Sequence, residues 1–185
     1  SSGKISFINK KAKFFKLNLL NKNIIFKKLK NFNILSIIHL ASYSDIIESK
    51  KKPKKYLKDN LLMTKNLLDF AVSNNIKNFI FSSTAAVYGN VDKKNVPIDE
   101  NCPLNPASPY ALSKVSQDLL GGVYFKNYGL KVIRTRMFTY LNPKRADLFA
   151  TSFARQVALI EKGHQKILYQ SLSRPHKNAA TAHSV

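Results

Sequence analysis

Short apolar runs alternate with longer stretches in which apolar residues recur at helical spacing. The near-continuous runs predict buried strands at residues 33–39, 78–81 and 130–136, with shorter strands at 14–19 and 167–169. Helical periodicity predicts helices at 21–31, 56–74, 108–127 and 149–162. Strands that alternate with helices are typical of an α/β fold, here a doubly wound parallel sheet with helices on both faces.

Hydroxyl side chains follow the strand at 78–81. The strand ends in Ser82, Ser83 and Thr84, and the helix at 108–127 carries Tyr110 and Lys114. Residues four apart share one helix face, so the Tyr110 phenol and the Lys114 ammonium are expected to reach the same site. The sequence therefore predicts a site at the C-terminal edge of the sheet, where ligands bind in open α/β folds.

This combination of strand end and Tyr-x-x-x-Lys helix resembles the extended short-chain dehydrogenase/reductases, a family with a Rossmann-like fold that includes nucleotide-sugar epimerases and dehydratases. The resemblance implies a catalytic set of Thr84, Tyr110 and Lys114. A tyrosine has a pKa near ~10, so its use as a base near pH 7 requires about 4 kcal/mol of phenolate stabilisation. A nearby ammonium and the positive nicotinamide act in that direction.

The resemblance also implies a cofactor, NAD or alternatively NADP, and a nucleotide-sugar substrate. The implied cofactor-binding residues are Asn18, Leu19, Leu40, Ala41, Ser42, Asn60, Ser82, Ser83, Tyr110, Lys114 and Phe138. The implied substrate-binding residues are Thr84, Tyr110 and Thr139. Several positions depart from the family pattern. Asn18 replaces an Asp that precedes the apolar residue against the adenine, Ser44 stands where many 4-epimerases have a Lys, Thr139 replaces an Asn that binds the substrate phosphate, and the Gly usual before Pro143 is missing.

The residues after Thr84 distinguish the reactions of the family. Dehydratases carry a Glu there for proton transfer, whereas this chain has Ala85 and Ala86, as in UDP-glucose 4-epimerases. Residues 134–136 and 152–163 instead resemble GDP-mannose 4,6-dehydratases and GDP-4-keto-6-deoxymannose reductases. We expect 4-epimerisation first and these GDP-sugar reactions second. A non-enzymatic binding module descended from the family is the alternative from another functional class.

Glycines are scarce at the start of the chain. A dinucleotide-binding domain of this family begins with a strand and a glycine-rich turn, but Gly3 is the only glycine before Gly89. The resemblance begins near Phe14. These features predict an internal fragment that lacks the first βαβ unit and most of the substrate domain. We expect a partial NAD(P)-binding domain at 1–170 and a disordered tail at 171–185, where periodicity is absent.

Charge and cysteine content add little to this picture. The net charge is +21, but lysine rather than arginine is enriched, so we expect no nucleic-acid partner and a solvated loop for the lysine run at 50–55. Cys102 is the single cysteine, and we expect no metal site. The sequence shows no apolar run long enough for a membrane span, and we expect a cytoplasmic protein. The resemblance implies a homodimer through the helices at 56–74 and 108–127, with contacts from Leu67, Leu68, Leu119 and Val123.

Overall fold

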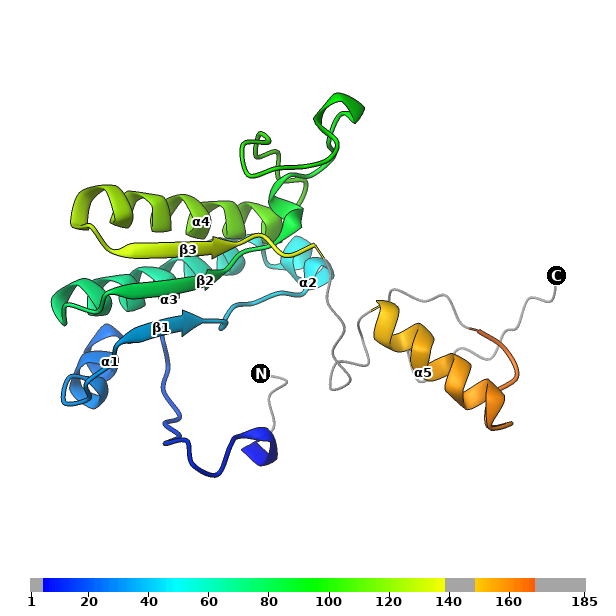
Figure 1. Cartoon of the computed structure of the whole chain (residues 1–185), viewed down its shortest axis with the longest axis horizontal. Helices are drawn as coiled ribbons and strands as arrows, with labels where there is room; N and C mark the ends of the chain where they lie inside the picture. Colours follow the sequence, from blue (N-terminus) through cyan, green and yellow to red (C-terminus); the bar gives the residue numbers. More distant parts are fainter. Residues whose placement is uncertain (1–4, 139–148, 169–185) are drawn as a thin grey trace. The chain divides into compact units, whose positions relative to one another are not determined.

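The structure is a computed structural model that describes residues 5–138 and 149–168. The chain divides into two compact units, one within residues 1–138 and the other within residues 139–185. The first unit holds the sheet and its helices, and the second holds helix α5 (Phe149–Glu161) (Figure 1).

A three-stranded parallel sheet forms the centre of the first unit. Strands β1 (Ser36–His39), β2 (Asn78–Ser82) and β3 (Lys131–Thr135) lie side by side in the order β1-β2-β3. The register aligns Ile38, Ile80 and Ile133 across one face of the sheet. The opposite face carries Phe79 and Phe81, which are buried beneath the helices. The strands predicted at 33–39, 78–81 and 130–136 are thus confirmed.

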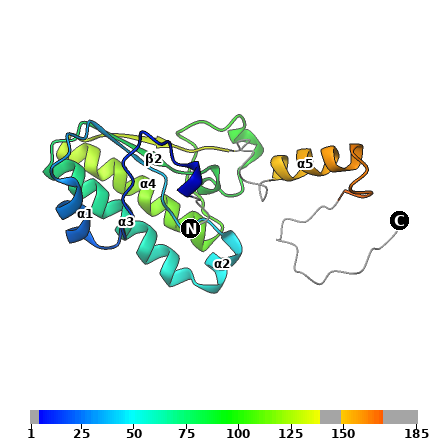
Figure 2. The same ribbon diagram turned by 90° about the horizontal axis from the view of Figure 1, so that it is seen from below.

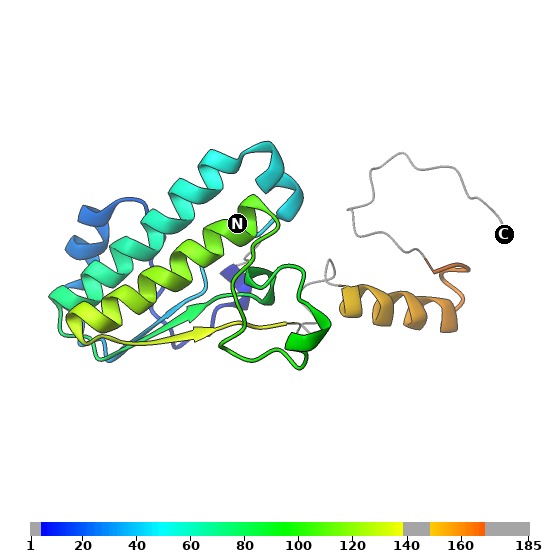
Figure 3. The same cartoon turned by 90° about the horizontal axis from the view of Figure 1, so that it is seen from above.

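The helices of the first unit form one layer on the sheet. Figures 2 and 3 show α1 (Lys22–Leu29), α3 (Pro53–Ser73) and α4 (Pro109–Tyr128) on the same side of the strands. A shorter helix, α2 (Ile46–Lys51), precedes α3, and 3-10 turns lie at Ile5–Phe7, Ala85–Val87 and Lys93–Asn95. Among the described residues of this unit, no helix covers the face with Ile38, Ile80 and Ile133, so the prediction of helices on both faces is confirmed for one face.

The helix limits follow from local chemistry. The side chains of Asn21, Asp45 and Ser108 cap α1, α2 and α4 by accepting backbone N–H bonds. Helix α4 ends at Gly129, whose φ of 65° is the left-handed conformation that suits glycine. The helices predicted at 21–31, 56–74, 108–127 and 149–162 all form, with ends shifted by up to three residues.

The lysine run at 50–55 is helical except at Lys52, which separates two helices, and this corrects the prediction of a loop. It spans the end of α2 and the start of α3, with Pro53 at the first position of α3. Pairs four residues apart favour this conformation: Lys52 Nζ lies 3.1 Å from Glu48, and Lys55 Nζ lies 2.8 Å from Asp59.

Two predicted short strands do not form. Residues 14–19 are not a strand, because no strand among the described residues pairs with them, and Phe14 and Phe15 remain exposed. The described residues 167 and 168 are not in a strand either, and Tyr169 lies outside the described residues. The predicted tail at 171–185 also lies outside them. A strand needs a partner, which a local apolar pattern does not provide.

Candidate active site

The C-terminal ends of the three parallel strands meet at one edge of the sheet, and helix α4 begins there (Figure 1). Lys114 Nζ donates a hydrogen bond to the Ser82 carbonyl oxygen at 2.8 Å, at the end of β2. Tyr110 lies one turn earlier, in the first turn of α4, and is half-buried. The N-cap bond from Ala111 N–H to Ser108 Oγ, at 3.1 Å, fixes the start of this turn. The helix therefore brings Tyr110 and Lys114 to the strand end that precedes Thr84.

The Lys114 ammonium is held in a largely apolar environment. Its side chain is buried, and Nζ lies 4.9 Å from the centre of the Phe81 ring. Burial lowers the pKa of Lys114 to about 8. The group still carries its positive charge at pH 7. An ammonium has three donors, and the Ser82 carbonyl takes one, so the donor set suits a ligand with hydroxyl groups.

Thr84 begins a tight turn after β2. Its side chain accepts a hydrogen bond from Ala86 N–H at 3.3 Å, and the 3-10 turn Ala85–Val87 follows directly. Ala85 N–H donates to the Met137 carbonyl oxygen at 2.9 Å, which joins this turn to the segment after β3. Thr84 is therefore anchored within the turn, at the same sheet edge as Lys114.

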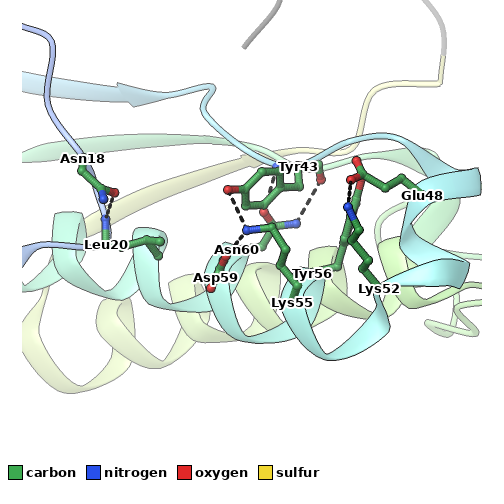
Figure 4. A network of polar contacts seen from close by, with 9 residues as sticks. All are labelled: Asn18, Leu20, Tyr43, Glu48, Lys52, Lys55, Tyr56, Asp59 and Asn60. Carbon is green, nitrogen blue, oxygen red and sulfur yellow. Dashed lines mark hydrogen bonds and ion pairs between the residues drawn. The ribbon is translucent and has the colours of Figure 1, made fainter.

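Asn60 connects the segment after β1 with the helix that carries Tyr110 (Figure 4). This fully buried side chain accepts from Tyr43 N–H at 2.8 Å and donates to the Tyr43 carbonyl oxygen at 3.0 Å. The same amide donates to Ser113 Oγ at 2.9 Å, and Ser113 Oγ donates to the Tyr110 carbonyl oxygen at 2.8 Å. Asn60 thus has a positional role between two parts of the site. The sequence pattern did not single out Tyr43 or Ser113.

Polar side chains of α3 contact both helix α2 and the segment after β1 beside this network. Tyr56 Oη donates to Glu48 at 3.1 Å, and Lys55 Nζ donates to Tyr43 Oη at 3.1 Å (Figure 4). Burial and the bond to Glu48 raise the pKa of Tyr56 to about 12, so its hydroxyl stays a donor at pH 7. These contacts join α3 to α2 and to the segment after β1.

A buried histidine lies at the end of β1. His39 Nε2 is 2.9 Å from Thr64 Oγ1, and the Gln117 side chain donates to the same Thr64 oxygen. Burial, together with the positive charge of Lys114, lowers the pKa of His39 to about 4. The imidazole is therefore neutral at pH 7. The sequence placed His39 in a strand, but its burial against α3 and α4 depends on the tertiary packing.

The predicted cofactor residues do not all lie together. Leu40 and Ala41 are exposed directly after β1, and Ser42 is half-buried with its hydroxyl donating to the Tyr43 carbonyl oxygen. Phe138 is exposed and stacks on Tyr88, with ring centres 6.2 Å apart.

Asn18 and Leu19 lie apart from this group, and Thr139 lies outside the described residues. Asn18 Oδ1 accepts from Leu20 N–H at 3.0 Å, within a local turn over the later part of α3 (Figure 4). The Leu19 carbonyl oxygen accepts from the Asn66 side chain at 2.9 Å, and the Leu19 side chain packs against the core. The side-chain carbonyl of Asn18 is thus already used as a turn acceptor.

Comparison with known proteins identifies the family. The sequence profile of the family described as GDP-mannose 4,6 dehydratase matches residues 3–176. The chain belongs to this family of NAD-dependent nucleotide-sugar epimerases and dehydratases. Its relatives include a UDP-glucose 4-epimerase from Lactobacillus helveticus, which is 36% identical over 131 residues; the match covers 71% of this chain and 39% of the relative.

Solved structures of similar proteins agree with the fold. RMD from Pseudomonas aeruginosa, complexed with NADPH, superposes with a TM-score of 0.74 at 28% identity, covering 82% of this chain and 52% of that chain. A UDP-glucose 4-epimerase from Thermus thermophilus, in complex with NAD, gives a TM-score of 0.73 at 27% identity, covering 88% and 53%. These Rossmann-fold neighbours confirm the predicted family and fold class. This family member thus spans about half the length of these structures.

Neither a membrane-spanning helix nor a cluster of metal ligands is present in the described part of this family member. In residues 5–138 and 149–168, no helix has the length and apolar character needed to cross a membrane. Within the same residues, no three His, Cys, Asp or Glu side chains cluster in a way that would hold a metal ion.

Replacing Lys114 with Met should stabilise the chain by about 2 kcal/mol at pH 7, because a buried ammonium with a pKa of about 8 opposes folding. The unfolded chain holds this proton up to the ordinary pKa of 10.5. The difference between variant and wild type should therefore shrink as the pH rises from 8 to 10.5. Urea unfolding of both proteins at several pH values measures this difference in the free energy of unfolding.

The exposed Lys131 provides the matched control for this experiment. Lys131→Met should change the free energy of unfolding by less than about 0.5 kcal/mol at every pH. A Lys114→Met variant that is less stable than wild type at pH 7 would contradict the assigned environment.

Proposed function

We propose that the protein containing this chain is an NAD-dependent nucleotide-sugar 4-epimerase, which oxidises the substrate at C4 transiently and returns the hydride. The observation that carries the proposal is the Lys114 bond to the Ser82 carbonyl oxygen, which places the Tyr-x-x-x-Lys helix at the strand end before Thr84. A hydroxyl side chain, a phenol and an ammonium then lie on elements that meet at one edge. Both the relative from Lactobacillus helveticus and the structure from Thermus thermophilus are 4-epimerases, which supports the choice.

Each of the three residues has a distinct task in this mechanism. The Thr84 hydroxyl hydrogen-bonds the C4 oxygen of the sugar and orients it, and the Tyr110 phenolate takes the proton of that hydroxyl. Lys114 stabilises the phenolate by its charge, which burial strengthens because the local dielectric is low. A bound nicotinamide would supply the hydride acceptor. When the keto sugar has turned over, Tyr110 returns the proton to the C4 oxygen.

The residues around this edge fit a dinucleotide. The donors of Lys114 suit ribose hydroxyls, and the backbone at Leu40, Ala41 and Ser42 follows β1 at the same edge. Ser82, Ser83 and Phe138 complete the proposed cofactor contacts. The Asn60 side chain holds the backbone that follows Ser42 in place through its two bonds to Tyr43. We propose NAD as the cofactor, with NADP as the alternative. Asn18 and Leu19 would contact the adenine side, and Thr139 the substrate phosphate.

The second candidate is a GDP-sugar reaction, either 4,6-dehydration or reduction of the 4-keto sugar. The match to the GDP-mannose 4,6 dehydratase profile favours it. Dehydration requires an acid and a base beyond Tyr110, and the two residues after Thr84 are alanines, which transfer no protons. The alanines therefore favour epimerisation. Incubation of the whole protein with NAD and a nucleotide-hexose tests the choice, because only an epimerase forms the C4 epimer without loss of water.

We also propose that the whole protein is a homodimer whose interface includes α4. Leu112, Leu119 and Val123 form an exposed apolar stripe along this helix, and Leu61 is exposed on α3. Leu67 and Leu68 are buried in the core of the chain, so the prediction that they contact a partner is wrong for those two residues. The length and periodicity of α3 did not show which of its apolar positions face the sheet.

A charged double variant, Leu119→Lys with Val123→Lys, should convert the dimer to a monomer, because it places two ammonium groups in the apolar interface. Size-exclusion chromatography with light scattering measures the mass. The matched control is Val96→Lys, at an exposed apolar residue outside α4. A wild-type protein that is monomeric at micromolar concentration would contradict the proposal.

A further inference from the structure

A buried carboxylate lies one turn after Lys114 on α4. Asp118 is fully buried and accepts hydrogen bonds from Arg136 Nε and Nη2, both at 3.0 Å. Arg134 Nη1 adds a third bond at 3.1 Å. Burial raises the pKa of Asp118, but the hydrogen bonds to its carboxylate, above all from Arg136, and the charges of Arg136 and Arg134 together outweigh burial and hold this pKa below its usual value. Asp118 is therefore charged at neutral pH, and it joins α4 to β3 and to the residues after that strand.

The second side of the Arg136 guanidinium contacts two loops. Its Nη1 donates to Tyr88 Oη at 3.0 Å and to the Glu100 carbonyl oxygen at 3.0 Å. The guanidinium carbon also lies 5.3 Å from the centre of the Tyr88 ring, within the range of a cation–π contact. Arg136 thus binds the helix through one edge and the turn that follows Thr84 through the other.

We infer that the bridge formed by Asp118, Arg136 and Tyr88 positions Thr84 against the helix that carries Tyr110 and Lys114. Tyr88 is buried and lies four residues after Thr84, at the end of the same turn. The bridge joins the two segments that carry the proposed catalytic residues: the turn that begins at Thr84 and the helix with Tyr110 and Lys114. Its kinetic consequence rests on the proposed function, whereas the bridge itself is a property of this chain.

The chemistry of the bridge suits positioning better than stability. A buried ion pair loses about as much by desolvation as it gains by attraction, so it adds little net stability. Arginine, in contrast, imposes direction, because its donors are fixed in one plane and bind a carboxylate through two parallel bonds. A small apolar cluster of Val87, Tyr88, Cys102 and Val115 packs the same turn against α4.

Hydrogen exchange of the 185-residue chain tests the inference directly. Tyr88→Phe removes one hydroxyl and leaves the Asp118–Arg136 pair intact. We expect amide exchange in residues 84–89 to become about tenfold faster, since a hydrogen bond to a charged group is lost. Exchange in α3 should stay unchanged. The matched control is Arg134→Lys: Arg134 also bonds Asp118, but that bond does not reach the Tyr88 turn, so exchange in residues 84–89 should stay within about twofold of wild type.

Kinetics of the whole protein add a readout that a merely structural role would not move. Tyr88→Phe should lower kcat about tenfold and change KM for the nucleotide sugar by less than about twofold, because Thr84 contacts only the reacting C4 oxygen and its misplacement leaves the rest of the substrate bound. Unchanged exchange in residues 84–89, or equal acceleration in α3, would overturn the inference. Absence of turnover in the wild-type whole protein would refute the proposed function instead, and the exchange result would still decide the role of the bridge.

Discussion

Tyr110→Phe should abolish hydride transfer in the whole protein while NAD binding is retained. The variant lacks only the phenolic oxygen, which is the proposed proton acceptor, and the ring still fills its place in the first turn of α4. General acid–base catalysis contributes roughly 10²–10⁴-fold to a rate, so we expect kcat to fall by about a thousandfold or more. A coupled assay of epimer formation measures kcat, and calorimetry measures NAD affinity.

Tyr128→Phe is the matched control, because Tyr128 is the last residue of the same helix and its side chain is exposed. This control should retain kcat within about twofold. A Tyr110→Phe enzyme with undiminished turnover would show that another group takes the proton. Loss of both turnover and NAD binding would indicate a damaged pocket rather than a missing base.

Gly89→Ala should destabilise the chain by about 3 kcal/mol or more. The Gly89 backbone has a φ of 60°, and an added Cβ would lie 1.8 Å from the Asn105 carbonyl oxygen. The left-handed conformation costs an alanine about 1 kcal/mol, and relief of the overlap requires backbone movement that costs about 1–3 kcal/mol more. The movement would separate the Thr84 turn from the loop that covers it. Urea denaturation monitored by circular dichroism measures the loss.

Gly129→Ala separates the two contributions. Gly129 has a φ of 65°, but no atom of the described residues lies within 4 Å of the position that an added Cβ would take. This variant should therefore lose only about 1 kcal/mol, the conformational part. Equal losses for Gly89→Ala and Gly129→Ala would contradict the close approach between Gly89 and Asn105.

Elements with strong local signals could be predicted from the sequence. The buried strand at 78–81 and the helix at 108–127 both formed near their expected limits, because each carries its own apolar pattern and the helix has its cap at Ser108. The same signals placed Tyr110 and Lys114 on one helix face. These two elements were therefore enough to predict that the site lies at the C-terminal edge of the sheet.

Features that depend on contacts distant in the chain could not be predicted. The apolar pattern at 14–19 does not indicate whether another strand lies beside these residues. The lysine run at 50–55 is helical on both sides of Lys52, because the cap at Asp45 and pairs such as Lys55–Asp59 outweigh its polar character. The bond from Arg136 to Asp118 joins residues on separate elements. The sequence does not indicate which of its charged residues pair with each other.

The proposed epimerase oxidises and reduces one carbon, C4, and eliminates no water. Reaction of the whole protein with NAD and a nucleotide-hexose in D₂O, followed by NMR and mass spectrometry of the sugar, tests this proposal most directly. Epimerisation returns the substrate's own hydride to C4, so we expect the C4 epimer with no deuterium bound to carbon. A product that has lost water and carries solvent deuterium at C5 would contradict the account and identify a dehydratase.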